Sequence, residues 1–172
     1  MEFLSKDRCY QVGKKHRWEY WEIVIKYLEI INPKSTLELG PSIQPIVIDG
    51  DTITKNKIEK PTYLWNAIDT PWPIKKKKYD VFVALQVWEH LRGNQIKVFK
   101  EVPRVSHMAI LSLPYKWPGN SSHSNINKVK IREWTSPHDP FIKPKRVRNK
   151  IIYLFNFSKK IDKNMKERLK KI

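Results

Sequence analysis

The chain has few cysteines and glycines and no long apolar segment. Cys9 is its only cysteine, which excludes an internal disulfide and a cysteine-based metal site and is typical of a reducing compartment. No stretch reaches the roughly 18 apolar residues that a membrane-spanning helix needs. The opening residues, MEFLSKDRCYQ, lack the apolar core of a signal peptide. These absences predict a cytoplasmic protein without a transmembrane segment.

The length and the distribution of charge predict one domain with a basic end. With 172 residues, the chain is long enough for one domain with its own core and too short for two ordinary ones. The net charge is +17, and residues 143–172 contribute +10 of it, from twelve Lys or Arg against Asp162 and Glu167. Such a segment is typical of contact with phosphates, on nucleic acid or on an anionic membrane surface. A lysine-rich composition without such a partner is the alternative.

Two apolar runs predict strands of a parallel sheet. Residues 79–91 read YDVFVALQVWEHL, and the uninterrupted run VFVAL is typical of a strand that is buried on both faces. A shorter run, STLELG at residues 35–40, predicts another strand. Ligands of parallel sheets bind beyond the carboxyl ends of the strands. We therefore expect both segments to end at one functional edge, with Gln86, Glu89 and His90 at it.

The remaining pattern predicts further helices and strands. Helices are expected at residues 17–31, 94–102 and 127–134, and strands at residues 62–65, 108–113 and 147–157. In the second of these helices, Ile96, Phe99 and Val102 are expected to face inward. Residues 41–61 contain three prolines and a Gly-Asp turn, which leave little room for a helix. The second strand of the sheet is then either residues 46–48 or residues 52–54.

The last segment, residues 158–172, predicts a basic amphipathic helix that follows a domain of residues 1–157. Ser158 is expected to cap this helix, with Ile161, Met165, Leu169 and Ile172 on its apolar face. We predict that the helix anchors the domain to an anionic surface. Packing of the apolar face on the domain itself is the alternative.

Four blocks of the sequence occur in an informative order. They are LELG at residues 37–40, NAIDTPWP at 66–73, YDVFVALQVWEHL at 79–91 and EVPRVSHMAILSLPY at 101–115. In this order and spacing they resemble the motifs of class I S-adenosylmethionine-dependent methyltransferases. The resemblance implies an α/β fold with a Rossmann-like, mostly parallel sheet, here with a shortened first-helix region. It also implies S-adenosylmethionine as the cofactor.

The resemblance also implies which residues would hold that cofactor. Glu38 and Gly40 match the acid and the first glycine of the loop after the first strand, where Ser42 and Gln44 replace the next two glycines. An acid after the second strand would hold the ribose, for which Asp49 and Asp51 are candidates and Asp51 is preferred.

Further cofactor contacts follow from the later blocks. Asn66 would accept from the adenine amino group in place of the usual Asp, and Ala67 would leave room for the ring. Gln86 would face the methionine moiety.

Candidates for proton transfer follow the buried strand. Histidine ionises near neutral pH, so His90 is a candidate base, with Glu89 beside it. His90 could instead only pack against the neighbouring loop, and methyl transfer often needs little beyond alignment of the reactants. His123, His138 and Asp139 lack metal-ligand spacing, so no metal site is predicted.

Two functions remain open at this point. The first is methyl transfer to a small-molecule or glycan acceptor, which Glu38, Gly40 and the WEHL segment favour. The second is a catalytically degenerate fold that serves as a basic module for binding nucleic acid or a membrane surface. The missing loop glycines, Asn66 and the shortened helix region favour this second function.

Overall fold

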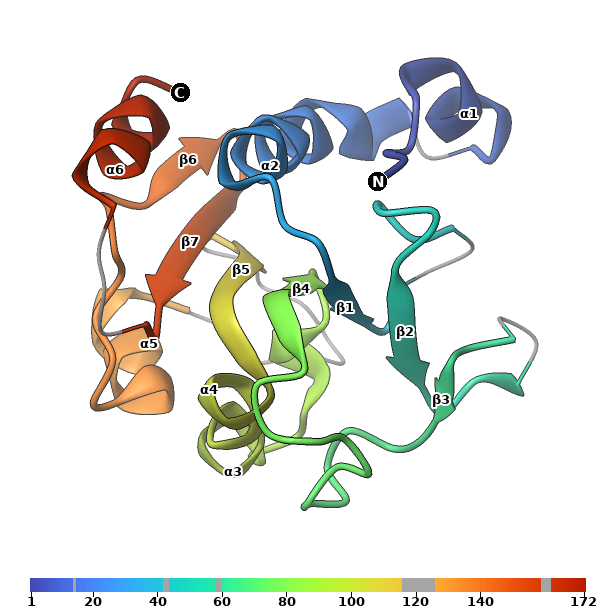
Figure 1. Ribbon diagram of the computed structural model, residues 1–172, viewed down its shortest axis with the longest axis vertical. Coiled ribbons are helices and arrows are strands. Elements are labelled where there is room, and N and C mark those ends of the chain that lie inside the picture. Colours follow the sequence, from blue (N-terminus) through green and yellow to red (C-terminus); the bar gives the residue numbers. More distant parts are fainter. Residues whose placement is uncertain (14, 42–43, 58–59, 116–125, 159–161) are drawn as a thin grey trace.

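All named strands of the computed structural model belong to one twisted sheet with helices on both sides (Figure 1). The structure describes residues 1–13, 15–41, 44–57, 60–115, 126–158 and 162–172. The strands are β1 (Thr36–Leu39), β2 (Asp51–Thr54), β3 (Tyr63–Leu64), β4 (Tyr79–Leu85), β5 (Ser106–Pro114), β6 (Lys145–Val147) and β7 (Lys150–Asn156). Their order in the sheet is β3-β2-β1-β4-β5-β7-β6. Strands β1 to β5 pair in parallel, and β7 runs antiparallel to both β5 and β6.

The helices form two layers that cover the two faces of the sheet (Figure 1). They are α1 (Lys6–Gln11), α2 (Trp18–Ile31), α3 (Gln95–Phe99), α4 (Glu101–Val105), α5 (Lys128–Thr135) and α6 (Lys163–Lys170), with short 3-10 turns η1 (Lys15–Arg17) and η3 (Trp88–His90). None of the described helices is both long and apolar enough to cross a membrane.

Strand β4 shows why the sheet has two buried faces. Val81 and Val83 point into the core cluster that also contains buried residues of α1, α2 and α6. Phe82 and Ala84 point into the other cluster, with residues of α3, α4 and α5. Successive side chains of a strand face opposite sides of the sheet. The uninterrupted apolar run is therefore a strand buried on both faces, as the sequence predicts.

The connection between β1 and β2 contains no helix in its described residues, 40–41 and 44–50. The N-terminal segment packs here instead. Leu4 N donates to Ile46 O at 2.9 Å, and Phe3 forms an isolated bridge with Val47. Both Ile46 and Val47 are buried in the cluster with α2. The region between β1 and β2 is thus shortened, as the sequence predicts. The second strand, β2, corresponds to the later of its two candidate segments, residues 52–54.

Three expected elements differ from the structure. Residues 94–102 form two short helices, α3 and α4, and Ile96 is 44% exposed because Val98 and Phe99 take the inward positions. The predicted last strand is the second half of a hairpin, because β6 and β7 meet at a turn in which Arg148 has a φ of 50°. The final helix begins at Lys163, where Asp162 rather than Ser158 caps it through bonds from Asn164 N and Met165 N.

The apolar face of α6 packs on the domain. Leu169 is 1% exposed within the core cluster that contains α2, and Met165 and Ile172 pack against that cluster. Figure 1 shows α6 beside β6, on the same side of the sheet as α2. Ile161 lies outside the described residues. The prediction that this face is free to anchor the protein is wrong, because it completes the core.

Candidate functional site

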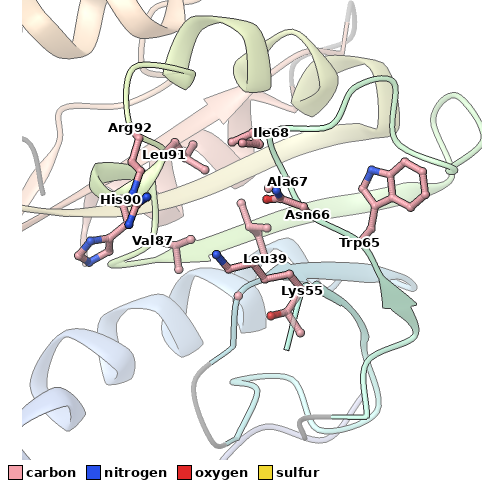
Figure 2. Close-up of a pocket in the computed structure, with 12 residues that line it drawn as sticks. Leu39, Lys55, Trp65, Asn66, Ala67, Ile68, Val87, His90, Leu91 and Arg92 are labelled. Carbon is pink, nitrogen blue, oxygen red and sulfur yellow. The ribbon is translucent and has the colours of Figure 1, made fainter. Parts of the chain in front are cut away.

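A cavity of about 350 Å³ opens at the carboxyl edge of the sheet (Figure 2). It is lined by Leu39, Gly40, Thr54, Lys55, Trp65, Asn66, Ala67, Ile68, Val87, His90, Leu91 and Arg92. Figure 2 shows Val87 and His90 on one side, Asn66 and Ala67 on the other, and Leu39 and Lys55 between them. The segments after β1, β2, β3 and β4 therefore converge, which is where ligands bind in parallel sheets.

The turn after β1 requires glycine at position 40. Gly40 has a φ of +57°, a conformation that other residues adopt only with strain. A Cβ there would also lie 3.2 Å from both Cγ atoms of Val87. Glu38 is 6% exposed, and its Oε2 accepts from Ile46 N at 2.7 Å. Glu38 thus holds the loop and is not among the residues that line the cavity, while Ser42 lies outside the described residues.

Asp51 lies at the wrong end of β2 to hold a ribose. It pairs with Leu37 near the start of the parallel strands, whereas Gly40 follows their carboxyl ends. Burial would raise the pKa of Asp51, but bonds from Tyr79 Oη at 2.5 Å and Lys78 Nζ at 3.0 Å outweigh it, and that pKa is lowered. Asp49 is also engaged, because it accepts from Glu2 N at 2.8 Å.

Thr54 and Lys55 stand at the carboxyl end of β2 instead. Both line the cavity, together with the cationic Arg92 and with His90. None of the described lining residues carries a carboxylate. The first cavity therefore offers a hydroxyl and cations where the resemblance implies an acid.

Asn66 and Ala67 lie in the cavity as the sequence predicts. The turn that carries them is fixed by bonds at both ends: Asp69 N donates to Asn66 O at 2.9 Å, and Trp72 Nε1 donates to Ala67 O at 2.9 Å. Trp72 is buried and stacks on Phe82 at 5.7 Å between ring centroids. The core thus positions the amide of Asn66 at the cavity.

A second cavity, of about 470 Å³, lies next to the first. It is lined by His16, Arg17, Tyr20, Gln86, Glu89, His90, Pro114, Arg148, Asn149 and Lys150. His90 lines both cavities, and its side chain is 51% exposed. Gln86, expected in the cofactor site, lines this second cavity instead. It has a φ of 58°, and its Nε2 donates to Ser112 Oγ at 3.1 Å, because β4 and β5 bring the two residues together.

Glu89 is the most unusual side chain of the second cavity. It is 4% exposed, and its Oε2 has no hydrogen-bond partner among the described residues. Burial raises the pKa of Glu89 to about 7, although Lys150 and Arg17 act in the opposite direction. Its Oε1 lies 4.0 Å from His90 Nε2. A carboxyl group with a pKa near neutrality can accept or donate a proton at physiological pH.

The histidine and aspartate of the loop region after β5 form no metal site in the described structure. His138 packs edge-on against Phe157, with 4.9 Å between ring centroids, and Asp139 lies 3.8 Å from Arg132 at the surface. The described residues contain no group of three His, Cys, Asp or Glu side chains able to hold a metal ion. His123 lies outside them.

The fold is shared with solved structures of methyltransferases. An S-adenosylmethionine-dependent methyltransferase from Clostridium acetobutylicum is similar with a TM-score of 0.62 at 9% identity, over 86% of this chain and 98% of that one. A SAM-dependent methyltransferase from Aquifex aeolicus gives 0.61 at 11% identity, over 90% and 100%. The 16S rRNA methylase ArmA gives 0.56 at 13% identity, over 89% and 91%. No protein-family model and no curated protein matches the chain.

The chain has the class I methyltransferase fold. Within this methyltransferase fold, three residues that the resemblance assigns to the cofactor, Gly40, Asn66 and Ala67, line the first cavity, and so does the candidate base His90. Their roles remain predictions. Lys55 was missed, because the sequence left open whether the second strand is residues 46–48 or residues 52–54. The later strand would have pointed to Lys55, the residue that follows it.

Sequence reasoning also missed the cationic side of the second cavity. Arg17 precedes α2, and Lys150 begins β7. No local pattern links these two residues to Glu89, because only the folded sheet brings them to one edge.

Proposed function

We propose that the chain binds S-adenosylmethionine in the first cavity and catalyses methyl transfer to an acceptor in the second, within the cytoplasm. The observation that carries this proposal is that the two cavities adjoin at His90, which lines both. Methyl transfer requires donor and acceptor to be held side by side. A small molecule or a glycan is the acceptor class that we favour.

The residues of the first cavity fit the cofactor in three respects. Gly40 lets the backbone approach closely, Asn66 offers a carbonyl to the adenine amino group, and Ala67 leaves room beside it. Thr54 can bond to a ribose hydroxyl, although more weakly than the carboxylate it replaces. The cavity of about 350 Å³ lies within the size range of small-molecule sites.

The chemistry that remains for the protein is removal of a proton. S-adenosylmethionine held by Gly40, Asn66 and Ala67 would supply an electrophilic methyl group for transfer from its sulfur to a lone pair of the acceptor. A proton on the acceptor atom then has to leave. Glu89 and His90 are the proposed proton acceptors, because both line the second cavity and the pKa of Glu89 is raised to about 7 by burial.

One observation favours the alternative function, a degenerate fold that binds anionic partners. The first cavity contains Lys55 and Arg92 but no carboxylate among its described lining residues. Some solved structures with this fold are rRNA methylases. A basic module for nucleic acid or a membrane surface would need the charge but not the cofactor.

Calorimetric titration with S-adenosylhomocysteine separates the two functions. We expect the wild type to bind with micromolar to sub-millimolar affinity, and Gly40→Ala to bind at least about tenfold more weakly because the new Cβ displaces Val87. Gly13→Ala is the matched control: Gly13 has a φ of +70°, so it has similar backbone strain, but apart from its chain neighbours no atom of the described residues lies within 4 Å of its Cβ position. No heat at millimolar ligand, or equal losses in both variants, would contradict the enzyme proposal.

A further inference from the structure

The second cavity combines several cationic groups with a single carboxyl group. Arg17, Arg148 and Lys150 line it, and Glu89 is the one acid among its described lining residues. Arg148 already pairs with Glu19, at 2.5 Å between Nη2 and Oε1. Arg17 and Lys150 both act electrostatically on the buried Glu89, so these two cations bear on the interior of the cavity.

Arg17 and Lys150 lie close enough to act on each other and on Glu89. Burial lowers the pKa of Lys150, Glu89 opposes that change, and Arg17 adds to it. The same two cations lower the pKa of Glu89 against the larger effect of burial. With a pKa of about 7, Glu89 is only partly ionised at neutral pH. Two neighbouring cations in a recess favour an anion between them.

Two buried oxygens in the same cavity have unused hydrogen-bonding capacity. Neither Glu89 Oε2 nor Tyr20 Oη has a hydrogen-bond partner among the described residues. Buried polar atoms in folded proteins are nearly always paired, and exceptions often mark functional positions. Here both atoms belong to residues that line a cavity large enough for a small molecule. A ligand with a hydroxyl or amino group would satisfy them.

We propose that the second cavity is the acceptor site for a small anionic molecule, whose phosphate or carboxylate lies against Arg17 and Lys150 and whose hydroxyl or amino group faces Glu89. The inference rests on the proposed function, and it assigns the acceptor class. The anionic group fixes the orientation of the acceptor, because charge-assisted bonds from two cations are strong and directional. The proton released from the methylated atom passes to the Glu89 carboxylate and from there to water.

Titration of the full chain with phenyl phosphate, benzoate and phenol tests this assignment by two-dimensional NMR. We expect the first or second compound to shift the amide resonances of Gln86, Asn149 and His90, and phenol, the neutral analogue, to leave them unchanged. Lys150→Met and Arg17→Gln should each weaken anion binding about tenfold. Lys100→Met is the control, since it removes the same charge from an exposed residue at the end of α3, which is not among the cavity's lining residues.

The arms of the experiment distinguish the outcomes. Shifts with phenyl phosphate alone identify a phosphate-bearing acceptor, and shifts with benzoate alone a carboxylate-bearing one. Absent shifts, equal losses in all three variants, or binding confined to a short single-stranded RNA would overturn the inference. Titration of each variant with S-adenosylhomocysteine keeps this test separate from the cofactor proposal, because Arg17 and Lys150 do not line the first cavity. Anion binding without any cofactor binding would refute the cofactor proposal and with it the acceptor role, and would leave the second cavity as an anion-binding site.

Discussion

Glu89 has a side chain whose ionisation is coupled to folding. Its pKa is raised by burial to about 7 from an ordinary value near 4.5. Below about pH 4.5 the carboxyl is neutral in both the folded and the unfolded chain, and its full contribution to stability is present. As the pH rises through about 7, the unfolded chain has already released the proton while the folded chain must ionise a buried group. This contribution is then lost, on the order of 3 kcal/mol.

The Glu89→Gln variant tests this coupling. A glutamine cannot ionise, so we expect the free energy of unfolding of the variant to exceed that of the wild type at pH 8 and the difference to shrink toward pH 5. The groups that face Glu89 are Lys150, Arg17, His90 and Tyr20, and all of them remain. Urea unfolding at a series of pH values gives both curves. Glu133→Gln, at an exposed position of α5, is the control, and its free energy of unfolding should change with pH as that of the wild type does. Parallel curves for Glu89→Gln as well would show that Glu89 ionises normally.

Asn66 stands where the resemblance implies an aspartate, and the two side chains differ by one heavy atom, a nitrogen in place of an oxygen. We predict that Asn66→Asp tightens binding of S-adenosylhomocysteine by about 1 kcal/mol, because a charge-assisted bond to the adenine amino group is stronger than a neutral one. Calorimetry measures the change. Asn149→Asp adds the same charge to the second cavity and serves as the control. Equal gains in both variants would indicate a general charge effect rather than a contact at Asn66.

At the scale of elements, α6 contributes to the core. Leu169 is 1% exposed beside residues of α2. We predict that Leu169→Ala lowers the free energy of unfolding by about 2–4 kcal/mol, since it leaves a cavity in a packed interior. Arg168→Ala, one position earlier on the exposed face, should change it by less than about 0.5 kcal/mol. Chemical denaturation compares them, and similar effects of both substitutions would mean that α6 detaches easily from the domain.

At the scale of the whole molecule, the charge of +17 remains unbalanced. The exposed lysines of the C-terminal segment are still available to an anionic partner, although the apolar face of α6 is not. We predict that replacing Lys163, Lys170 and Lys171 by Gln weakens binding to phosphatidylserine vesicles or to single-stranded RNA and makes that binding less salt-dependent.

This charge variant should leave the rest of the molecule unchanged. All three lysines are exposed, and the ion pair of Lys170 with Glu167 is a surface pair that contributes little, so affinity for S-adenosylhomocysteine and stability are expected to match the wild type. Cosedimentation with vesicles and filter binding of RNA at several salt concentrations provide the measurements. Binding that is as strong and as salt-dependent as before would show that other basic residues carry it.

The sequence by itself determined the central strands and the position of the glycine turn. The run VFVAL and the segment LELG report local properties, namely which side chains are buried and where the backbone needs glycine. Both were predicted correctly because burial on two faces of a strand produces a pattern within a few residues. Asn66 and Ala67 followed from the resemblance, and His90 from its place after the buried strand.

Only the tertiary structure decided which residues share a cavity. Asp51 was misplaced because a strand of four residues carries too little pattern to fix its ends, and Asp51 and Thr54, three positions apart, lie at opposite ends of β2. Likewise, the apolar stripe of α6 fits a surface or a core equally well until its neighbours are known. Arg17, Glu89 and Lys150 meet because the sheet order places β4, β5 and β7 next to one another, with α2 packed across them. Such long-range pairing depends on the packing of the whole chain, which no local stretch of sequence encodes.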